Sequence, residues 1–293
     1  MHDKLPVFHS FLYIPSNIKM MRTLLLLCFK LIAGSFCLAQ EVAYETVENI
    51  SYIDDTTDNY QAQQCQMDIH YPTSGALKPV VIWYHGGGLT GGRREIPTFL
   101  KNKGLVVVGV GYRFAPKVRV HDIIEDAAKA VSYVMHHADK YHGDKRKIFL
   151  SGHSAGGYLT LMMGLNKTFL ERERVDVGEI AGIISFSGQA ITHFTARQEA
   201  GIPEKQPTIG ELAPLYWVCK DAPPIVLLTG DRELEMLGRY EENAYLKRML
   251  LLVGHPNVQL IEFEGYGHDM TYPGFPILVS AIKRILSERE ELQ

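Results

Sequence analysis

The chain places one serine between two glycines in Gly152-His153-Ser154-Ala155-Gly156, directly after the apolar run 147–150. This arrangement is typical of a strand, a sharp turn and a helix. Side chains at positions 152 and 156 would clash with the neighbouring strand or helix, so glycine is required there. The pattern predicts a strained backbone at Ser154 and a hydroxyl exposed at the end of a sheet.

Strands and helices alternate through the rest of the chain. Segments 43–53 and 64–71 alternate apolar and polar residues, which predicts an antiparallel pair. Segments 80–84 and 105–110 are continuous apolar runs, typical of buried parallel strands. The order predicts an α/β fold with a mostly parallel, twisted sheet and helices on both faces. Further strands are expected at 180–186, 225–229 and 258–263, and helices at 122–141, directly after Ser154, at 239–253 and at 275–288.

The composition indicates a globular protein with one large core. The chain has 293 residues, of which 46% are hydrophobic and 22% charged, and its formal net charge is −3. A chain of this length and composition buries enough apolar surface to fold as one domain. The charge balance excludes the basic surface that nucleic acids require, so we expect no nucleic-acid partner.

The N-terminal segment has the features of a secretory signal. Met21-Arg22 opens a positive region, residues 24–36 are mainly apolar, and small residues precede a cleavage site after Ala39. We therefore expect residues 1–39 to be an N-terminal extension with a signal peptide, residues 1–20 lying upstream of the true start, and residues 40–293 to be the folded domain. The apolar stretch is shorter than the roughly 20 residues of a membrane span. The expected protein is secreted or periplasmic and has no stable membrane span after cleavage; a membrane anchor and a lipidated Cys37 are the alternatives.

Two cysteines, Cys65 and Cys219, remain after that cleavage. Neither lies in the spacing of a metal site, and two cysteines make no disulfide framework. We expect two unpaired, buried thiols, with a single disulfide in an oxidising compartment as the alternative.

A serine hydroxyl needs a base to accept its proton. We predict that this base is His268, because it lies in a glycine-containing loop between the last expected strand and the closing helix. Other histidines, such as His136, His137 and His142, fall on or after a long expected helix, where solvated side chains are common.

The base needs an acid to orient it, and in chain order this acid follows the strand 225–229. Asp231, Glu233 and Glu235 all lie there. Glu235 stands at the expected distance before the next helix, whereas Asp231 is placed to cap backbone amides of the turn. The sequence favours Glu235, then Asp231, then Glu233, without separating them.

Ester or amide cleavage also needs donors for the developing oxyanion. The run His85-Gly86-Gly87-Gly88 follows the strand 80–84, and its glycines allow backbone N–H groups to face a substrate. We predict Gly86, Gly87 and the amide of Ala155 as donors. His85 is expected to support the loop rather than to catalyse.

The segment 188–224 is rich in proline, which predicts an irregular lid or cap. Its aromatic residues Phe194, Tyr216 and Trp217 would either form a wall for a phenolic acyl group or pack the lid onto the body.

These motifs together resemble those of α/β-hydrolases of the hormone-sensitive-lipase and feruloyl/acetyl-esterase-like (BD-FAE-like) groups. The acid turn differs from the Asp-Pro-Leu of the hormone-sensitive-lipase group, and little sequence precedes residue 51 to build that group's cap. The feruloyl/acetyl-esterase-like branch therefore fits better. The matching segments are 85–88, the Gly-Val-Gly-Tyr-Arg-Phe-Ala-Pro run at 109–116, 152–157, 230–231 and 267–268, within a resemblance that runs from about residue 51 to the C-terminus.

The resemblance implies an α/β-hydrolase fold and an exported serine carboxylic ester hydrolase without metal or cofactor. It would cleave small acyl esters, of acetyl or feruloyl type, on small molecules or polysaccharides through an acyl-enzyme. An arylformamidase, amidase or peptidase with the same triad is the close alternative. A catalytically inactive hydrolase fold that binds carbohydrate or protein is the alternative of another class.

Overall fold

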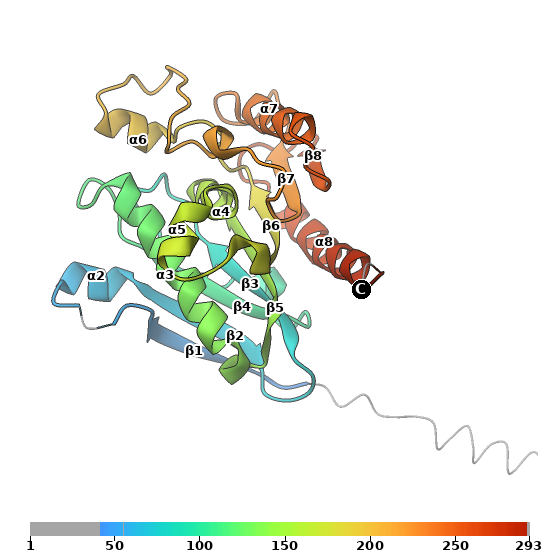
Figure 1. Cartoon of the computed structure of the whole chain (residues 1–293). Coiled ribbons are helices and arrows are strands. Elements are labelled where there is room, and N and C mark those ends of the chain that lie inside the picture. The colour runs from blue at the N-terminus through green and yellow to red at the C-terminus, as the bar shows by residue number, and fades with distance from the viewer. Residues whose placement is uncertain (1–41, 55, 292–293) are drawn as a thin grey trace, which may run out of the picture. The chain divides into compact units, whose positions relative to one another are not determined.

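One eight-stranded sheet organises the part of the chain that the structure, a computed structural model, describes, namely residues 42–54 and 56–291 (Figure 1). Its strands are β1 (Tyr44–Ser51), β2 (Gln66–Pro72), β3 (Lys78–Tyr84), β4 (Val106–Val110), β5 (Gly143–His153), β6 (Ile180–Phe186), β7 (Ile225–Gly230) and β8 (Val258–Phe263). Their order in the sheet is β1-β2-β4-β3-β5-β6-β7-β8.

Strands β3 to β8 are parallel, and only the β1–β2 and β2–β4 pairs are antiparallel. Every residue of β4, β6 and β7 is buried. Strands covered on both faces must be apolar along their whole length, which explains the continuous runs in the sequence. The edge strand β1 is mostly exposed and carries polar residues instead.

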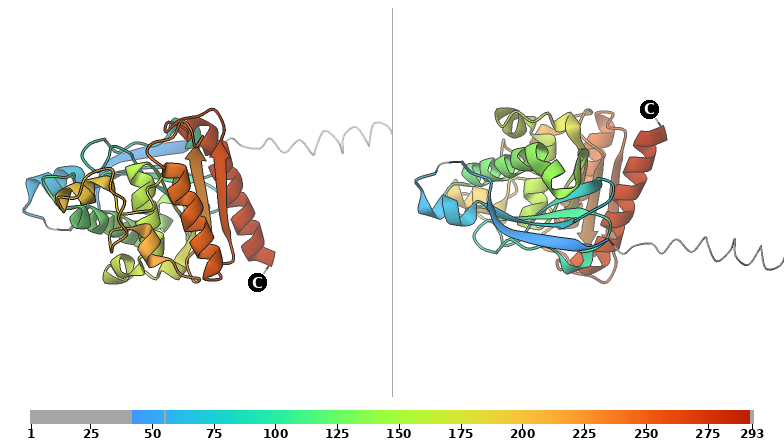
Figure 2. Two further views of the ribbon diagram at one scale, coloured as in Figure 1. Left: turned by 90° about the horizontal axis from the view of Figure 1, so that it is seen from above. Right: turned by 90° about the horizontal axis from the view of Figure 1, so that it is seen from below.

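Helices cover both faces of this sheet. Because successive strand residues point to opposite faces, Ile82 packs on the side of α3 and α4, and its neighbour Trp83 packs on the side of α8. Helices α7 and α8 pack on opposite faces of the sheet. Figure 2 shows them on the two sides of β7 and β8. The helices are α2 (Asn59–Gln64), α3 (Val120–His137), α4 (Ala155–Leu165), α5 (Lys167–Arg172), α6 (Phe194–Glu199), α7 (Arg239–Leu252) and α8 (Thr271–Glu291), with short 3₁₀ turns η1 (Thr98–Leu100), η2 (Ala138–Tyr141), η3 (Val177–Glu179) and η4 (Pro214–Trp217).

The observed elements confirm the expected α/β fold. Strands β6 and β8 have the expected bounds, and the opening pair β1–β2 is antiparallel. The long helix expected at 122–141 is α3 followed by the 3₁₀ turn η2, and the segment 188–224 is irregular apart from α6 and η4. Helices α2 and α5 were not expected, because six residues are too few to show helical periodicity.

Both cysteines are free, as expected. Cys65 is buried, and burial raises the pKa of its thiol to about 12. Cys219 is half-buried, which corrects the expectation that both thiols are buried. The predicted signal peptide and its cleavage site lie outside the described residues. Within those residues, no helix has the length and hydropathy of a membrane-spanning segment.

The carboxyl ends of the parallel strands gather the loops that carry the candidate site. Strand β3 leads into the loop 85–88, β5 leads into Ser154, β6 into Ser187, β7 into the turn at 231–238 and β8 into the loop with His268. Ligands of open α/β sheets bind at this edge.

Candidate active site

Ser154 occupies the sharp turn between β5 and α4. Its φ of 56° and ψ of −112° lie outside the regions that ordinary residues prefer, and the turn is held by a bond from the Ser154 amide to Phe186 O at 2.8 Å. A Cβ at Gly156 would lie 1.9 Å from the Tyr84 carbonyl oxygen, and a Cβ at Gly152 would lie 2.6 Å from the same oxygen. The predicted clashes on both sides of the serine are therefore present.

His268 comes within hydrogen-bond distance of this serine. Its Nε2 lies 2.8 Å from Ser154 Oγ, although the two residues are far apart in the sequence. On the other side of the ring, Nδ1 lies 2.6 Å from Oε1 of Glu235. A proton on Nδ1 leaves the Nε2 lone pair facing the hydroxyl, which is the arrangement that removes a proton from a serine.

Glu235 accepts four hydrogen bonds around its carboxylate. Besides His268, the donors are the Ser187 hydroxyl at 2.7 Å and the amides of Gly230 and Met236 at 3.0 and 2.9 Å. Burial by itself would raise the pKa of Glu235, but the bonds from His268, Ser187 and Met236 outweigh it and lower this pKa to about 2. Glu235 is therefore a carboxylate at neutral pH.

The other two carboxylates of the turn lie away from His268. Asp231 accepts the amides of Glu233 and Gly265, each at 2.9 Å, and these bonds lower the pKa of Asp231. It closes the turn, which is the alternative that the sequence offered for it. Glu233 is exposed. The structure thus brings only Glu235, among the three expected acids, into contact with the histidine.

The glycine loop approaches the serine from β3. A Cβ on Gly86 would lie 3.6 Å from the Cβ of Ser154. Gly87 has a φ of 119°, and a Cβ there would lie 2.1 Å from Gly91 O, so only glycine fits. No acceptor among the described residues takes up the backbone amides of Gly86 and Gly87. Ala155 begins α4, where an amide has no partner within the helix. These amides are the ones predicted as oxyanion donors.

His85 supports the glycine loop through its contacts with Tyr112 and Gly86. It is buried, its ring stacks on Tyr112 at 4.3 Å, and its Nδ1–H donates to Gly86 O at 2.6 Å. Burial lowers the pKa of His85 to about 4, so the ring is neutral at physiological pH. The contacts agree with the supporting role expected from the sequence.

Two residues that contact the triad, Ser187 and His153, were not predicted from the sequence. Ser187, at a φ of 49°, donates to Glu235, and its Oγ lies 3.0 Å from Nδ1 of His268. His153 donates from Nε2 to the backbone oxygen of His268 at 2.8 Å. Burial, and then the charge of His268, lower the pKa of His153 to about 4. No sequence motif includes Ser187. His153 lies inside the Gly-x-Ser-x-Gly motif, but at a position where the motif specifies no residue type.

Two cavities flank the irregular segment 188–224. One of about 430 Å³ is lined by Phe194 and Met236, the latter adjacent to Glu235. The larger, of about 880 Å³, is lined by Tyr216, Trp217 and the C-terminal end of α4. That end lies about 15 Å along the helix from Ser154. Of the three aromatic residues expected near the site, only Phe194 is placed there, and Trp217 packs against the core instead.

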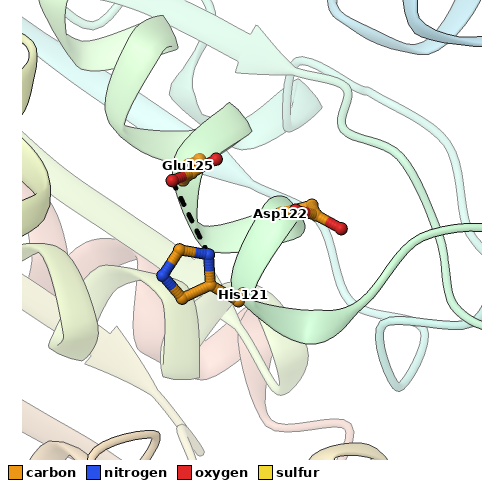
Figure 3. A group of neighbouring side chains, drawn as sticks. All are labelled: His121, Asp122 and Glu125. Carbon is orange, nitrogen blue, oxygen red and sulfur yellow. Dashed lines mark ion pairs between the residues drawn. The ribbon is translucent and has the colours of Figure 1, made fainter.

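One cluster of side chains in the described residues has the composition of a metal site. His121, Asp122 and Glu125 lie on the first turns of α3 (Figure 3). His121 Nδ1 lies 3.6 Å from Glu125, one turn along the helix, and Asp122 accepts the Arg119 amide at 3.0 Å as a helix cap. One potential ligand atom from each of the three side chains lies within 4.8 Å of the other two. Helix capping and an ordinary ion pair account for this cluster.

Comparison with known proteins gives relatives that are named as esterases. "Esterase LipC" of Mycobacterium tuberculosis is 26% identical over 239 residues, which cover 72% of this chain and 56% of the relative. "Acetyl esterase" of Salmonella schwarzengrund is 30% identical over 122 residues, 40% of this chain and 36% of the relative. The chain spans between about a quarter and just over half of the length of the curated relatives it matches.

Solved structures share the fold. A carbohydrate esterase from gut microbiota, in truncated form, matches with a TM-score of 0.68 at 18% identity, over 84% of this chain and 98% of the other. Esterase B of Lactobacillus rhamnosis matches with a TM-score of 0.65 at 18% identity, over 95% and 98%. The family model described as BD-FAE matches residues 67–237, more than half of the chain. The chain therefore belongs to the BD-FAE family, and its fold is that of the α/β-hydrolase esterases.

Proposed function

We propose that this protein is a serine carboxylic ester hydrolase that works through an acyl-enzyme. The observation that carries the proposal is the continuous chain of hydrogen bonds from Ser154 through His268 to Glu235, at 2.8 and 2.6 Å. Nucleophile, base and orienting acid lie in the order and geometry that acyl transfer requires.

The first half of the reaction follows from these positions. Ser154 Oγ attacks the ester carbonyl carbon while Nε2 of His268 takes the hydroxyl proton, and Glu235 stabilises the imidazolium. The carbonyl oxygen becomes an oxyanion beside the free amides of the glycine loop and of Ala155. When the C–O bond to the alcohol breaks, Nε2 returns the proton to the leaving oxygen.

The second half repeats the first with water. Nε2 of His268 takes a proton from a water molecule, which attacks the acyl-enzyme, and the collapse of the second tetrahedral intermediate returns that proton to Ser154 Oγ. The acid is released and the resting enzyme is restored. Every proton in this cycle passes through one nitrogen, so the cycle needs no metal or cofactor.

The relatives support the ester bond as the target. They include an acetyl esterase and a probable isoprenylcysteine α-carbonyl methylesterase of Oryza sativa, which is 32% identical over 147 residues, 45% of this chain and 35% of the relative. A carbohydrate esterase shares the fold. We propose small acyl esters, of acetyl or feruloyl type and on small molecules or polysaccharides, as the substrates.

A series of 4-nitrophenyl esters of rising acyl length tests this function, with formanilide as the amide competitor. We expect kcat/KM to be highest for short acyl chains and the Ser154→Ala variant to lose several orders of magnitude in kcat, on the order of 10⁴ or more. Faster cleavage of formanilide than of 4-nitrophenyl acetate would assign the protein to the amidases. No cleavage of either by a folded protein would favour a binding role.

We also propose that the protein is exported, because residues 21–39 have the pattern of a secretory signal peptide. Expression of the chain from Met21 in a bacterium with a secretion pathway tests this, by N-terminal sequencing of the product from periplasm or medium. The expected mature N-terminus is Gln40. Full-length protein retained in the cytoplasm would contradict the proposal.

A further inference from the structure

The cavity of about 430 Å³ contains two buried guanidinium groups. Its walls come from the segment 188–224 and from the N-terminal turn of α7. Arg197 on α6 and Arg239 on α7 both line it, and their exposed fractions are 4% and 3%. Arginine is almost never buried to this degree unless it is paired.

The guanidinium of Arg197 has no hydrogen-bond or ion-pair partner among the described residues. No hydrogen bond or ion pair engages its side chain there, and its Nε is buried without an acceptor. Burying a charged group is unfavourable when no acceptor or opposite charge compensates for the lost hydration. A ligand that supplied the missing acceptors would remove this cost.

Arg239 is only partly satisfied. Its Nη1 donates to the backbone oxygen of Ser187, but its Nε is buried without an acceptor. Glu242, on the same helix, is engaged elsewhere, because it accepts the amides of Ala190 and Ile191 at 3.0 and 3.5 Å. No ion pair within 4.0 Å joins either arginine to a carboxylate in residues 42–54 and 56–291.

Two residues that line the cavity also contact the candidate catalytic site. Met236, which lines it, donates its amide to Glu235. Phe194, which also lines it, has a ring atom 3.1 Å from the position of a Cβ on Gly88, and the next residue, Thr195, donates to Gly88 O at 2.6 Å. For a substrate group to occupy this cavity, a substrate held at Ser154 has to extend one substituent past Phe194 or Met236.

We infer that this cavity is a subsite for a carboxylate carried by the substrate, so that the enzyme prefers esters of which the acyl or the alcohol part bears a free acid group. The inference rests on the proposed ester hydrolysis and names a substrate class for it. A planar carboxylate matches the fork of donors on a guanidinium. Apolar neighbours such as Ile191, Phe194 and Leu237 suit the carbon chain or ring that carries the acid.

The charges around the cavity favour a single carboxylate over a phosphate. Besides the two arginines, Lys205, Glu204, Glu241 and Glu242 line it, and burial raises the pKa of Glu242. A dianion would meet these carboxylates at close range, whereas a monoanion is balanced by the two arginines. The volume, about 430 Å³, is that of a site for a small organic ligand.

Paired esters that differ only in this charge test the inference. The acyl arm compares the mono-4-nitrophenyl ester of glutarate with its glutaramate analogue, and the alcohol arm compares 4-acetoxybenzoate with 4-acetoxybenzamide. In one arm we expect wild-type kcat/KM to favour the acid by about tenfold or more, the effect of one charge-assisted hydrogen bond. Arg197→Met should remove that preference, and Arg197→Lys should restore part of it.

Arg248→Met is the matched control, because Arg248 is exposed on α7 and does not line the cavity. It removes the same charge and should leave the preference unchanged. A wild-type enzyme that cleaves acid and amide esters equally in both arms would overturn the inference while leaving the proposed function intact. So would an Arg197→Met variant that keeps the preference.

A binding measurement separates the two proposals if no ester is cleaved. Calorimetric titration of glutarate and of 4-acetamidobenzoate into Ser154→Ala protein should show binding of at least one, weakened about tenfold or more by adding Arg197→Met. Binding of this kind without ester cleavage would refute the proposed function and retain the anion subsite. Absence of binding that depends on Arg197 refutes the subsite.

Discussion

In the proposed reaction, Ser154 acts as a nucleophile because each side chain behind it is oriented by another. Ser187 and the amides of Gly230 and Met236 fix the carboxylate of Glu235, and Glu235 fixes the ring of His268. His153 holds the backbone of the same histidine. The hydroxyl therefore meets a base that is already in the correct tautomer and direction.

Substitutions of the three carboxylates in the turn after β7 test which of them orients His268. Glu235→Gln should lower kcat by about 10³–10⁴-fold, because a neutral amide cannot hold the imidazolium. Glu233→Gln, at an exposed position, should leave kcat unchanged. Asp231→Asn should lower the melting temperature more than kcat, since Asp231 closes the turn. Rates on 4-nitrophenyl acetate and thermal melts measure this; the largest loss of kcat in Asp231→Asn would refute Glu235 as the acid.

Ser187→Ala removes one donor from the carboxylate of Glu235. We expect kcat to fall by about tenfold, since hydrogen bonds to charged groups contribute about 1.5–3 kcal/mol. Ser185→Ala is the control. Ser185 lies on β6 and is buried like Ser187, but its hydroxyl donates to Gly157 O. Steady-state kinetics of both variants decide the point, and an equal loss in the two would exclude a positioning role for Ser187.

At the scale of elements, the turn between β5 and α4 depends on two glycines. Gly156→Ala places a Cβ 1.9 Å from Tyr84 O, a backbone atom that cannot move alone, so the turn must open. We expect the free energy of unfolding to fall by at least about 3 kcal/mol. Urea denaturation measures it, and full stability in Gly156→Ala would contradict the described turn.

Gly210→Ala is the matched control for that substitution. A Cβ there meets no atom within 4 Å, and the backbone has no positive φ. Its effect on the free energy of unfolding should stay within about 1 kcal/mol. A large loss at position 210 would mean that the irregular segment packs differently.

Helices and strands were predictable from the sequence where a single pattern of hydrophobic residues marks them. The buried parallel strands are continuous apolar runs, and β6 and β8 have the bounds that those runs indicate. Short helices such as α2 and α5 lack periodicity, and the long irregular segment carries no repeating pattern. Its arginine at 197 gives no sign in the sequence of being buried.

The site was predictable only in part for a related reason. Ser154 and the glycine loop depend on local backbone geometry, which glycine spacing records. The choice among three carboxylates depends on how one turn folds back onto a distant histidine, which spacing does not record. Ser187 contacts the site through a positive φ that no flanking glycine reveals.

At the scale of the whole molecule, the hydrogen bonds of the site make stability against acid depend on the carboxylate of Glu235. The pKa of Glu235 is lowered to about 2 in the folded state, below its ordinary value of 4.5. A carboxyl group with a lowered pKa stabilises the fold above its unfolded pKa and loses that contribution as pH falls. The loss is expected between pH 5 and pH 2.

The melting temperatures of the wild type and of Glu235→Gln, measured between pH 7 and pH 3, test this link. The wild type should lose more stability than the variant as pH falls below 5, because only the wild type must protonate this buried acid. Parallel curves for the two proteins across the whole range would contradict the ionised state assigned to Glu235.

The sheet brings together residues from five separate strand ends, and the proposed reaction depends most directly on Ser154 among them. Mass spectrometry of the protein after reaction with a fluorophosphonate probe tests it most directly, because the probe bonds only to an activated serine. We expect one adduct, on the peptide that contains Ser154, which is absent from Ser154→Ala and strongly reduced in His268→Ala. An unlabelled wild type, or an adduct on another serine, would contradict it.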